Sequence, residues 1–288
     1  NIFALAIPKS GVPMKFLMVE EKKVELLHEW YNGFSARFTT STKIFDPLQN
    51  LPPAHQFTNG KGKIVSSEAG VRLRYAYAEK FLESTFNRIS LGSQYPIVDV
   101  RYVKGLSNVF KSDYDYHKLS ASVSDYLKVA PFGTIYYNVF GGQTFGTLPY
   151  MLLDIAPGNE IYYYNPYAFN MMNRYEYLHD KYAGINVEHN FGSGIFRFVP
   201  LTRKLKFRQF WTAKALWGSL SAENTALNIN GSYPFETLNG RTYLELGTGI
   251  DNIFRVLRVD FIWRALPESR GKLANDRFGV FGSFRFSF

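Results

Sequence analysis

The sequence contains no cysteine among its 288 residues, and it contains no long apolar run. The absence of thiols excludes disulfides, zinc–thiolate sites and cysteine nucleophiles. A membrane-spanning helix needs about 20 consecutive, mostly apolar residues, whereas the apolar stretches here are short and interrupted by Lys, Arg, Asp or Asn. Because only helices and closed barrels satisfy the backbone inside lipid, a membrane location would require a barrel of strands.

A signal peptide is also lacking, since the sequence starts at Asn1 without a positively charged segment followed by an apolar core. We therefore expect a mature or partial chain, and we do not take this absence as an indication of a cytoplasmic protein.

The composition combines many aromatic residues with a positive net charge. There are 26 Phe, 20 Tyr and 4 Trp, and the formal net charge is +9. A basic protein can bind nucleic acid, but here the basic residues are dispersed and alternate with apolar ones. We expect no nucleic-acid partner and interpret the charge as belonging to the polar side of a barrel wall.

The carboxy-terminal residues alternate in the period-2 pattern of a strand with two different faces. One face carries Phe278, Val280, Gly282, Phe284, Phe286 and Phe288, and the other carries Arg277, Gly279, Phe281, Ser283, Arg285 and Ser287. In a bilayer the phenylalanine row would face lipid and the arginines a wet lumen. The aromatic positions Phe284, Phe286 and Phe288 also resemble the signal read by the outer-membrane assembly machinery, which we expect as a partner.

Similar alternation upstream predicts which charged residues face the lumen. An Arg or Lys facing lipid at the bilayer midplane would cost about 2–4 kcal/mol, so the basic members of the alternating runs must point inward. The predicted lumen-lining residues are Lys204, Lys206, Arg208, Lys214, Arg258, Arg264 and Arg285. Such a basic set can select anions or hold a plug, or it can pair with lumen acids such as Asp260 and Glu245.

These patterns predict an all-β transmembrane antiparallel β-barrel of about 12–16 strands over residues 21–288, preceded by an irregular lead-in or linker over 1–20. Turn signals separate the runs, and Asn32-Gly33 is typical of a tight hairpin. Short turns alternate with longer loops, as expected for the periplasmic and extracellular ends. A short amphipathic helix is an alternative to a strand for Lys22–Tyr31.

Several blocks resemble an uncharacterised Bacteroidota outer-membrane family. They are LGSQYPIVDVRYVKGL from Leu91, SDYDYHKL from Ser112, the stretch GGQTFGTLPYMLLDIAPGNEIYYYNPYAFNMMNRYEYLHDKY from Gly141, the run through VEHNF, FRFVPLTRKLKF and TAKALWGSLSAEN, and ELGTGIDNIFRVLRVDFIWR from Glu245. Full-length members place a carboxypeptidase-regulatory-like β-sandwich ahead of a barrel. The resemblance implies an outer-membrane location, a barrel fold and an amino-terminal sandwich domain outside this sequence. It implies no activity, because the function of the family is not established, and no peptidase, because the sandwich is non-catalytic.

The closing strands also look distantly like the barrels of the BamA and two-partner-secretion superfamily. The Arg-Gly-aromatic motif at the tip of the lumen-folded loop of those barrels is missing, since the region after Trp217 reads GSLSAENTALN. This departure argues against an insertase or secretion role.

Candidate catalytic and metal sites are weak. The histidines His28, His55, His117, His179 and His189 are scattered and match no zinc motif. On a strand, Glu188 and His189 face opposite sides, so they cannot share an ion. The segment Gly192-Ser193-Gly194 is better explained as a hairpin turn than as a nucleophile elbow.

Two loop clusters have a functional and a plainer interpretation. Asp113, Asp115, Asp154 and Glu160 could bind calcium, but they lack a calcium-loop pattern, and we expect solvated loop tips. Tyr162, Tyr163, Tyr164 and Tyr167 could form a carbohydrate-stacking platform, but an aromatic girdle at the membrane interface is the simpler expectation.

The leading hypothesis is a non-enzymatic protein of the bacterial outer membrane that assists envelope biogenesis or belongs to an outer-membrane complex. Expected partners are outer-membrane lipids, lipopolysaccharide and other outer-membrane proteins, with no cofactor and no metal. The alternative is a channel or transporter whose basic lumen passes small anions or oligomers. A third and weaker alternative is a barrel enzyme acting on lipid or peptide.

Overall fold

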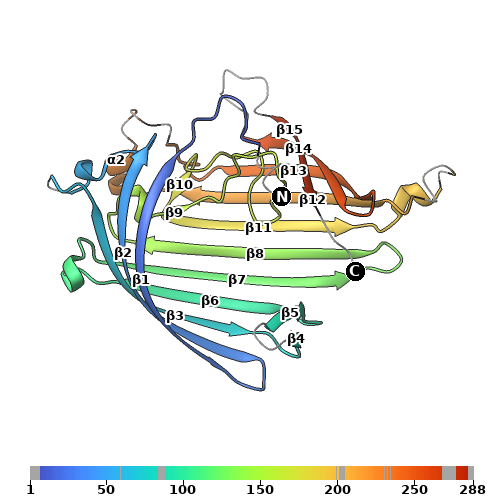
Figure 1. The fold of residues 1–288 in the computed structure, drawn as a ribbon, viewed down its shortest axis with the longest axis horizontal. Helices are drawn as coiled ribbons and strands as arrows, with labels where there is room; N and C mark the ends of the chain where they lie inside the picture. The colour runs from blue at the N-terminus through green and yellow to red at the C-terminus, as the bar shows by residue number, and fades with distance from the viewer. Residues whose placement is uncertain are drawn as a thin grey trace.

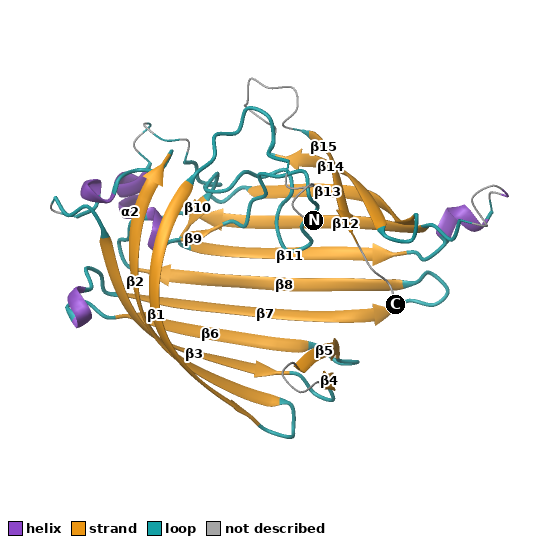
Figure 2. Cartoon of the chain, viewed as in Figure 1, coloured by secondary structure: helices purple, strands orange, loops and turns teal. Residues whose placement is uncertain are grey.

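The computed structural model describes residues 7–58, 60–83, 88–198, 200, 205–229, 231, 233, 235–267 and 277–284. Over this part of the chain the fold is all-β and antiparallel, as predicted, with fifteen strands (Figures 1 and 2). Eleven of them form one large sheet in the order β1-β2-β3-β6-β7-β8-β11-β12-β13-β14-β15. Each long strand therefore pairs with the next long strand along the chain.

The bounds of the large sheet follow the alternating runs of the sequence. Its strands are β1 (Phe16–Glu29), β2 (Phe34–Gln49), β3 (Ile64–Tyr75), β6 (Ile97–Gly105), β7 (Tyr116–Lys128), β8 (Thr134–Phe145), β11 (Lys181–Asn190), β12 (Arg208–Ser219), β13 (Thr242–Ile253), β14 (Leu257–Leu266) and β15 (Phe278–Phe284). Two small sheets pair β4 (Lys80–Glu83) with β5 (Arg88–Gly92), and β9 (Asp154–Ile155) with β10 (Leu178–His179).

The large sheet is strongly curled, but in the described residues β1 and β15 form its two edges and do not pair with each other (Figure 1). The structure therefore supports a barrel-like antiparallel sheet, and the closed transmembrane barrel remains a prediction.

The connections differ at the two ends of the strands. One end carries the tight turns 30–33, 129–133 and 254–256, together with the longer connections 76–96 and 191–207. The other end carries only long connections, 50–63, 106–115, 146–180, 220–241 and 267–277. We call these the short-turn end and the long-loop end. The predicted alternation of short and long connections is present, with two exceptions at the short-turn end.

The residue register gives the sheet two chemically distinct faces. Cross-strand partners such as Leu246 and Trp263, or Val139 and Ile185, share one face, which we call the outer face. Lys214 pairs with Glu245, and Glu245 pairs with Arg264, on the opposite or inner face. Because side chains alternate along a strand, this register assigns every residue of the long strands to one face or the other.

The long-loop end holds the largest hydrophobic cluster. Loop and strand-end residues pack together there, including Phe45, Leu51, Tyr116, Leu148, Tyr150, Leu152, Leu178 and Phe235. The short helix α2 (Ala222–Asn228) is tied to this cluster because its buried Asn224 accepts a hydrogen bond from the Leu148 N–H and Asn228 donates one to the Leu148 carbonyl. Described residues of the connections 50–63, 146–180 and 220–241 thus pack together at this end of the sheet.

Two local predictions can be compared directly with the strand bounds. Residues of the Lys22–Tyr31 segment belong to β1, so the strand interpretation is right and the helical alternative is wrong. The strand begins at Phe16, within the 1–20 segment that we expected to be irregular. Gly33 lies in the hairpin turn at φ 86°, where a Cβ would approach the Ala76 carbonyl oxygen to 2.5 Å, which explains the glycine of the Asn-Gly pair.

Within the described residues, no helix has both the length and the apolar character needed to cross a membrane.

Candidate functional site: the polar cluster beneath an inward-folded segment

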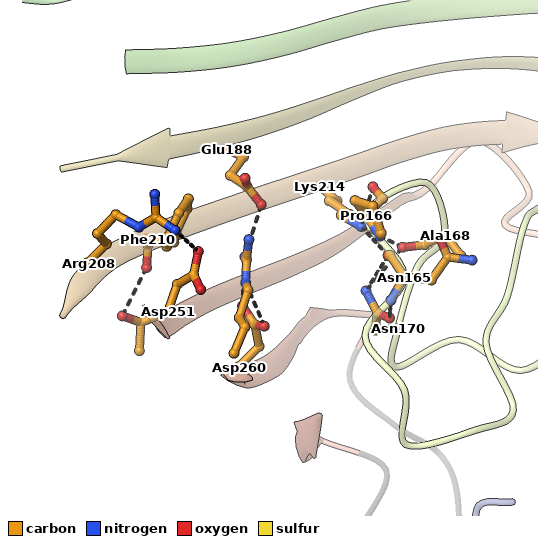
Figure 3. Close-up of polar contacts among 12 residues, drawn as sticks. Asn165, Pro166, Ala168, Asn170, Glu188, Arg208, Phe210, Lys214, Asp251 and Asp260 are labelled. Atoms are coloured by element: carbon orange, nitrogen blue, oxygen red, sulfur yellow. Dashed lines mark hydrogen bonds and ion pairs between the residues drawn. The ribbon is translucent and has the colours of Figure 1, made fainter. Parts of the chain in front are cut away.

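The connection between β9 and β10 lies over the inner face of the large sheet. We call residues 156–177 the inner segment. It contacts β12, β13 and β14 through buried polar side chains. The close-up shows the contacts that Lys214 of β12 makes with residues 165–168 (Figure 3). A chain segment of this length without regular structure needs partners for its backbone groups when it is buried, and strand side chains supply several of them.

Lys214 on β12 is the first of these partners. Its side chain is buried, and its Nζ donates hydrogen bonds to the carbonyl oxygens of Asn165 (3.1 Å), Pro166 (2.9 Å) and Ala168 (2.6 Å). These three bonds use the full donor capacity of an ammonium group. Lys214 therefore fixes the turn at 165–168 onto the sheet.

Glu245 on β13 is the cross-strand partner of Lys214 and is also buried. Its two carboxylate oxygens accept the backbone N–H groups of Asn170 (2.9 Å) and Met171 (2.6 Å), and the Tyr243 hydroxyl donates to the same carboxylate at 2.6 Å. Lys214 and Glu245 thus bind the carbonyl side and the amide side of one short stretch of chain.

Asparagines hold the inner segment in shape from within. The Asn170 side chain donates to the carbonyls of Asn165 (3.0 Å) and Ala168 (3.2 Å), and its side-chain oxygen accepts the Asn165 N–H at 2.9 Å. Asn159 donates to the same oxygen at 2.8 Å. Hydrogen bonds offset the free energy lost when an amide is removed from water. Here the donors and acceptors of these asparagines find partners within a few residues of the same segment.

Arg258 on β14 is the centre of a second buried cluster. Its guanidinium donates to both carboxylate oxygens of Asp260 and reaches Glu188 on β11 at 2.9 Å. It lies 4.6 Å from the ring centre of Tyr164 and 4.3 Å from that of Phe210. Burial raises the pKa of Tyr164 well above its ordinary value, so this residue keeps its proton and packs as a neutral ring over the cation.

Two further ion pairs extend the polar cluster toward the strand ends. Arg264 donates to Glu176 of the inner segment at 2.7 Å and also to the Tyr177 hydroxyl. Arg208 donates to the buried Asp251 at 3.1 Å. The inner face of β12–β14 is therefore filled by paired charges and by the inner segment, which we together call the filled half.

The predicted lumen-lining residues can now be located. Arg208, Lys214, Arg258 and Arg264 all lie on the inner face, in the filled half. Lys206 precedes β12 in a turn, at φ 52°, and is exposed. Lys204 and Arg285 lie outside the described residues. Of the assembly-signal residues, Phe284 ends β15 on the outer face, and Phe286 and Phe288 lie outside the described residues.

The inner face of the other strands is arranged differently. A cavity of about 490 Å³ lies over β1, β2, β3, β6 and β7. Its lining carries both signs of charge and includes Glu21, Lys23, Glu25, Arg37, Lys43, Glu68, Arg72, Asp99 and Arg101. Lys43 pairs with Glu68 at 2.8 Å, and Arg72 pairs with Asp99 at 2.6 Å. We call this region the open half.

The tyrosine prediction needs correction. Tyr164 is buried on the inner face beside Arg258, and the Tyr162 ring lies 6.1 Å from that of Phe281, which is also an inner-face residue. Only Tyr167 is largely exposed, at 76%. The expected girdle is therefore wrong for Tyr162 and Tyr164, because the segment that carries them folds inward.

The location of the inward-folded loop also needs correction. The sequence suggests the connection after Trp217 as the lumen-folded loop, but that connection contains α2 and packs at the long-loop end. The segment that folds over the inner face is 156–177, and it too contains no Arg-Gly-aromatic triplet. The departure from the BamA-type motif therefore stands, at a different loop.

The scattered histidines and carboxylates are separate in space. Glu188 faces Arg258 on the inner face, whereas His189 lies on the outer face and contacts the Phe132 carbonyl at 2.8 Å, as the predicted alternation requires. Gly192-Ser193-Gly194 lies in the turn that follows β11. Within the described part of the chain, no group of three or more His, Asp or Glu side chains converges as a metal site.

The four acidic loop residues each have a different cation beside them. Asp113 pairs with Lys61, Asp115 with Lys104, Asp154 with Lys118 and Glu160 with Lys15. They do not form one cluster, and the expected solvated loop tips are wrong as well, because only the Asp115 side chain is mostly exposed (55%), whereas those of Asp113 and Glu160 are 13% exposed and Asp154 lies in β9.

Sequence reasoning missed the residues that hold the inner segment. Asn159, Asn165 and Asn170 were not singled out, although their spacing within GNEIYYYNPYAFN is a usable signal. Asparagine side chains bond to backbone groups a few residues away, so three of them in a loop indicate a structured coil rather than a solvated loop.

Comparisons with known proteins agree with this fold. The structure is similar to that of BamA from Haemophilus ducreyi lacking POTRA domains 1–3, with a TM-score of 0.55 and 12% sequence identity, over 94% of this chain and 55% of that chain. The chain thus spans about half the length of that protein, and the expected distant likeness to a BamA barrel is confirmed for the fold. No curated protein matches the chain.

A family model also matches residues 23–250, which is well over half of the chain. Its description is a family of unknown function (DUF5686), C-terminal domain. The Bacteroidota origin and the amino-terminal sandwich domain that the resemblance implied stay predictions. The chain belongs to the DUF5686 C-terminal domain family.

Proposed function

We propose that this chain is the membrane-embedded part of a bacterial outer-membrane β-barrel protein, that it has no enzymatic activity, and that it serves envelope biogenesis or a larger outer-membrane complex. The observation that carries the proposal is the inversion of its two faces. In a water-soluble antiparallel sheet the covered face is apolar and the solvent face polar. Here the covered inner face holds the buried charges, and the outer face is apolar.

The outer face is a broad apolar surface with no covering element among the described residues. Its exposed side chains include Leu73, Val98, Leu119, Val139, Ile185, Trp211, Leu246, Trp263 and Val280. A soluble monomer rarely exposes a continuous apolar patch of more than a few hundred Å², whereas a membrane barrel requires one around its circumference. Outer-membrane lipids and lipopolysaccharide are the partners that fit this surface.

Aromatic residues lie near both ends of the outer face, as interfacial girdles do. Exposed rings at the long-loop end include Tyr102, Phe145 and Phe278, and those at the short-turn end include Trp30, Tyr75, Tyr77 and Tyr95. The girdle that the sequence suggested at the Tyr162 cluster is thus better assigned to these strand-end residues.

The polar cluster supports a structural or assembly role. The predicted lumen cations of the filled half are neutralised by Asp251, Asp260, Glu188 and Glu176, or saturated by backbone carbonyls. Among the described residues, each of these four cations bonds to a carboxylate or to backbone carbonyls. The proposed protein partners are other outer-membrane proteins and the outer-membrane assembly machinery, which would recognise the carboxy-terminal strand.

The channel alternative rests on the open half. Its cavity and its half-exposed charges could line a water-filled path. Because acidic and basic residues alternate there, the path would not be strongly anion-selective. Steady conductance of weak ion selectivity after reconstitution into planar bilayers would favour a channel through the open half over the non-conducting role.

Lipid contact of the outer face can be tested by fluorescence quenching in liposomes of brominated lipid. A variant that keeps Trp263 as its only tryptophan should be quenched strongly, because this residue is 44% exposed on the outer face. The matched control carries Phe210→Trp as its only tryptophan, at a buried inner-face position, and should be quenched weakly. Equal quenching, or a protein that stays monodisperse without detergent, would overturn the proposal.

A further inference from the structure

The edge of β15 is already partly occupied. Gly282 donates its N–H to the Tyr162 carbonyl at 3.0 Å and accepts the Tyr164 N–H at 2.9 Å. This is a parallel bridge between Tyr163 and Gly282. The backbone of 162–164 therefore sits where the next strand of the sheet would sit.

The alternation of β15 shows that these bonds use its free edge and not its pairing with β14. Gly282 is aligned with Val259 of β14, but its N–H and carbonyl bond to Tyr162 and Tyr164 instead. Since backbone groups point to alternate sides along a strand, those of Gly282 face away from β14 and those of Phe281 and Ser283 face toward it. An outside strand aligned at Gly282 would need the same two groups.

Side chains anchor the occupying segment on the inner face. Tyr162 packs against Phe281, and Tyr164 packs over Arg258. Two residues apart, these rings fit the period of a strand lying against β15. Lys214 and Glu245 then hold the chain that follows, at 165–171.

The far side of the segment is covered as well. Tyr162 donates its N–H to the Ile7 carbonyl at 2.9 Å, and Lys9 donates its N–H to the Glu160 carbonyl at 2.8 Å. The segment thus lies between β15 and residues 7–9. Unpaired strand edges template pairing with other chains, and proteins cover them for that reason.

We propose that residues 162–164 act as an internal edge strand that masks β15, so that pairing of any other strand at Gly282 requires displacement of this segment. The device couples the polar cluster to the edge: loosening the inner segment unmasks the edge, and engaging the edge frees the inner segment.

Cysteine pairs test the bridge directly, because the chain has no cysteine of its own. In Tyr163→Cys/Gly282→Cys the two residues are adjacent-strand partners, at a spacing suited to a disulfide. A Cβ at Gly282 meets only the Arg258 carbonyl oxygen, at 3.9 Å, so the substitution fits. The control Tyr163→Cys/Val280→Cys is offset by two residues, which places the pair beyond disulfide reach.

After mild oxidation of the full chain in detergent micelles, we expect at least a tenfold higher yield of intramolecular disulfide in the first variant. Equal yields, or no disulfide in either variant, would overturn the bridge.

A second experiment tests masking. Gly282→Cys alone should give little disulfide-linked dimer in the otherwise unchanged chain, and several-fold more when combined with Lys214→Met, which removes three anchors of the segment. Lys9→Ala provides a second background, because it removes the hydrogen bonds that the Lys9 Nζ donates to the carbonyl oxygens of Asn159 (2.5 Å) and Asn170 (2.6 Å) from the other side of the segment. Equal dimer yields in all backgrounds would show that the segment does not mask the edge.

Hydrogen exchange of the unmodified chain provides a readout that needs no loosened variant to fold. The Gly282 amide should exchange slowly, at a rate within about tenfold of the Phe281 and Ser283 amides that face β14. Fast exchange at Gly282 beside slow exchange at its two neighbours would refute the internal strand.

Discussion

The two halves of the inner face contain the same residue types and use them differently. In the filled half, Lys214, Glu245, Arg258 and Asp260 are buried, and each bonds to backbone or to a close counter-ion. In the open half, pairs such as Arg72–Asp99 keep much of their solvent contact, with the Arg72 side chain 46% exposed. The comparison teaches that the number of charged residues on the inner face does not predict whether that face is filled or open, because the partner of each charge decides its role.

The largest expected effect is in the filled half. Lys214→Met removes three hydrogen bonds and leaves the carboxylate of Glu245 buried without its neighbouring cation. Removing one of two oppositely charged buried groups lowers the free energy of unfolding by about 3–5 kcal/mol. Urea-induced unfolding of the protein in liposomes should show this loss. Lys43→Met in the open half, which removes a partly exposed pair with Glu68, is the control and should cost about 1 kcal/mol.

The pH dependence of stability tests whether the buried side chain of His179, next to the inner segment, is excluded from water. His179 on β10 is buried against Tyr182, its Nδ1 has no hydrogen-bond partner in the described structure, and burial lowers its pKa to about 4. The carboxylates of Asp154 and Asp180 favour the charged form and Lys118 opposes it, but burial dominates.

The sign follows from the lowered pKa of His179. The unfolded chain binds a proton below about pH 6.5, and the folded chain does not until about pH 4. Stability should therefore fall as the pH drops through this window, by at most about 3 kcal/mol. In His179→Gln this component should vanish from the difference between unfolding free energies at pH 7 and pH 4.5. An unchanged pH profile would mean that His179 is hydrated.

A smaller effect is expected from the aromatic contact over Arg258. Tyr164→Leu keeps an apolar side chain but removes the ring beside the guanidinium, and desolvated cation–π contacts contribute about 2 kcal/mol. The exposed Tyr167 lies in the same segment, and Tyr167→Leu should change the free energy of unfolding by less than about 0.5 kcal/mol. If both variants lost the same stability, the contrast between buried and exposed rings would be lost.

The smallest effect is expected at the cavity of the open half. Arg101 lines it and is exposed, so Arg101→Gln should change the unfolding free energy by about 0.5 kcal/mol or less. If Arg101→Gln lowered the unfolding free energy by more than about 1 kcal/mol, Arg101 would be buried in the protein. The open half would then differ from the filled half only in degree.

Much of the fold could be predicted because period-2 alternation is a direct consequence of strand geometry. In the run Leu257–Ala265 apolar residues alternate with Arg258, Asp260, Ile262 and Arg264, so that Ile262 is the one apolar residue on the charged side. Such runs predicted the inner positions of Arg208, Lys214, Arg258 and Arg264. The start of β1 did not, because Phe16–Val19 is apolar on both faces and Pro13 precedes it.

The inner segment could not be predicted from periodicity. A coil that folds back leaves no repeating signal, and its partners Lys214 and Glu245 are separated from Asn165–Met171 by more than 40 residues. The tyrosine cluster was therefore assigned to a membrane interface on composition alone. Composition identifies what a residue can do, and only the path of the chain decides which neighbour it meets.

The ladder that joins residues 7–9, 160–162 and Gly282 has a consequence for biogenesis. Its three components come from the start, the middle and the last strand of the described chain. Contacts at such sequence separation form late and slowly. These hydrogen bonds can be completed only after β15 has been synthesised. A product truncated before β15 would keep the anchors at 165–171 but lose those at 162 and 164, so proteolytic cleavage near residues 162–164 would report incomplete synthesis.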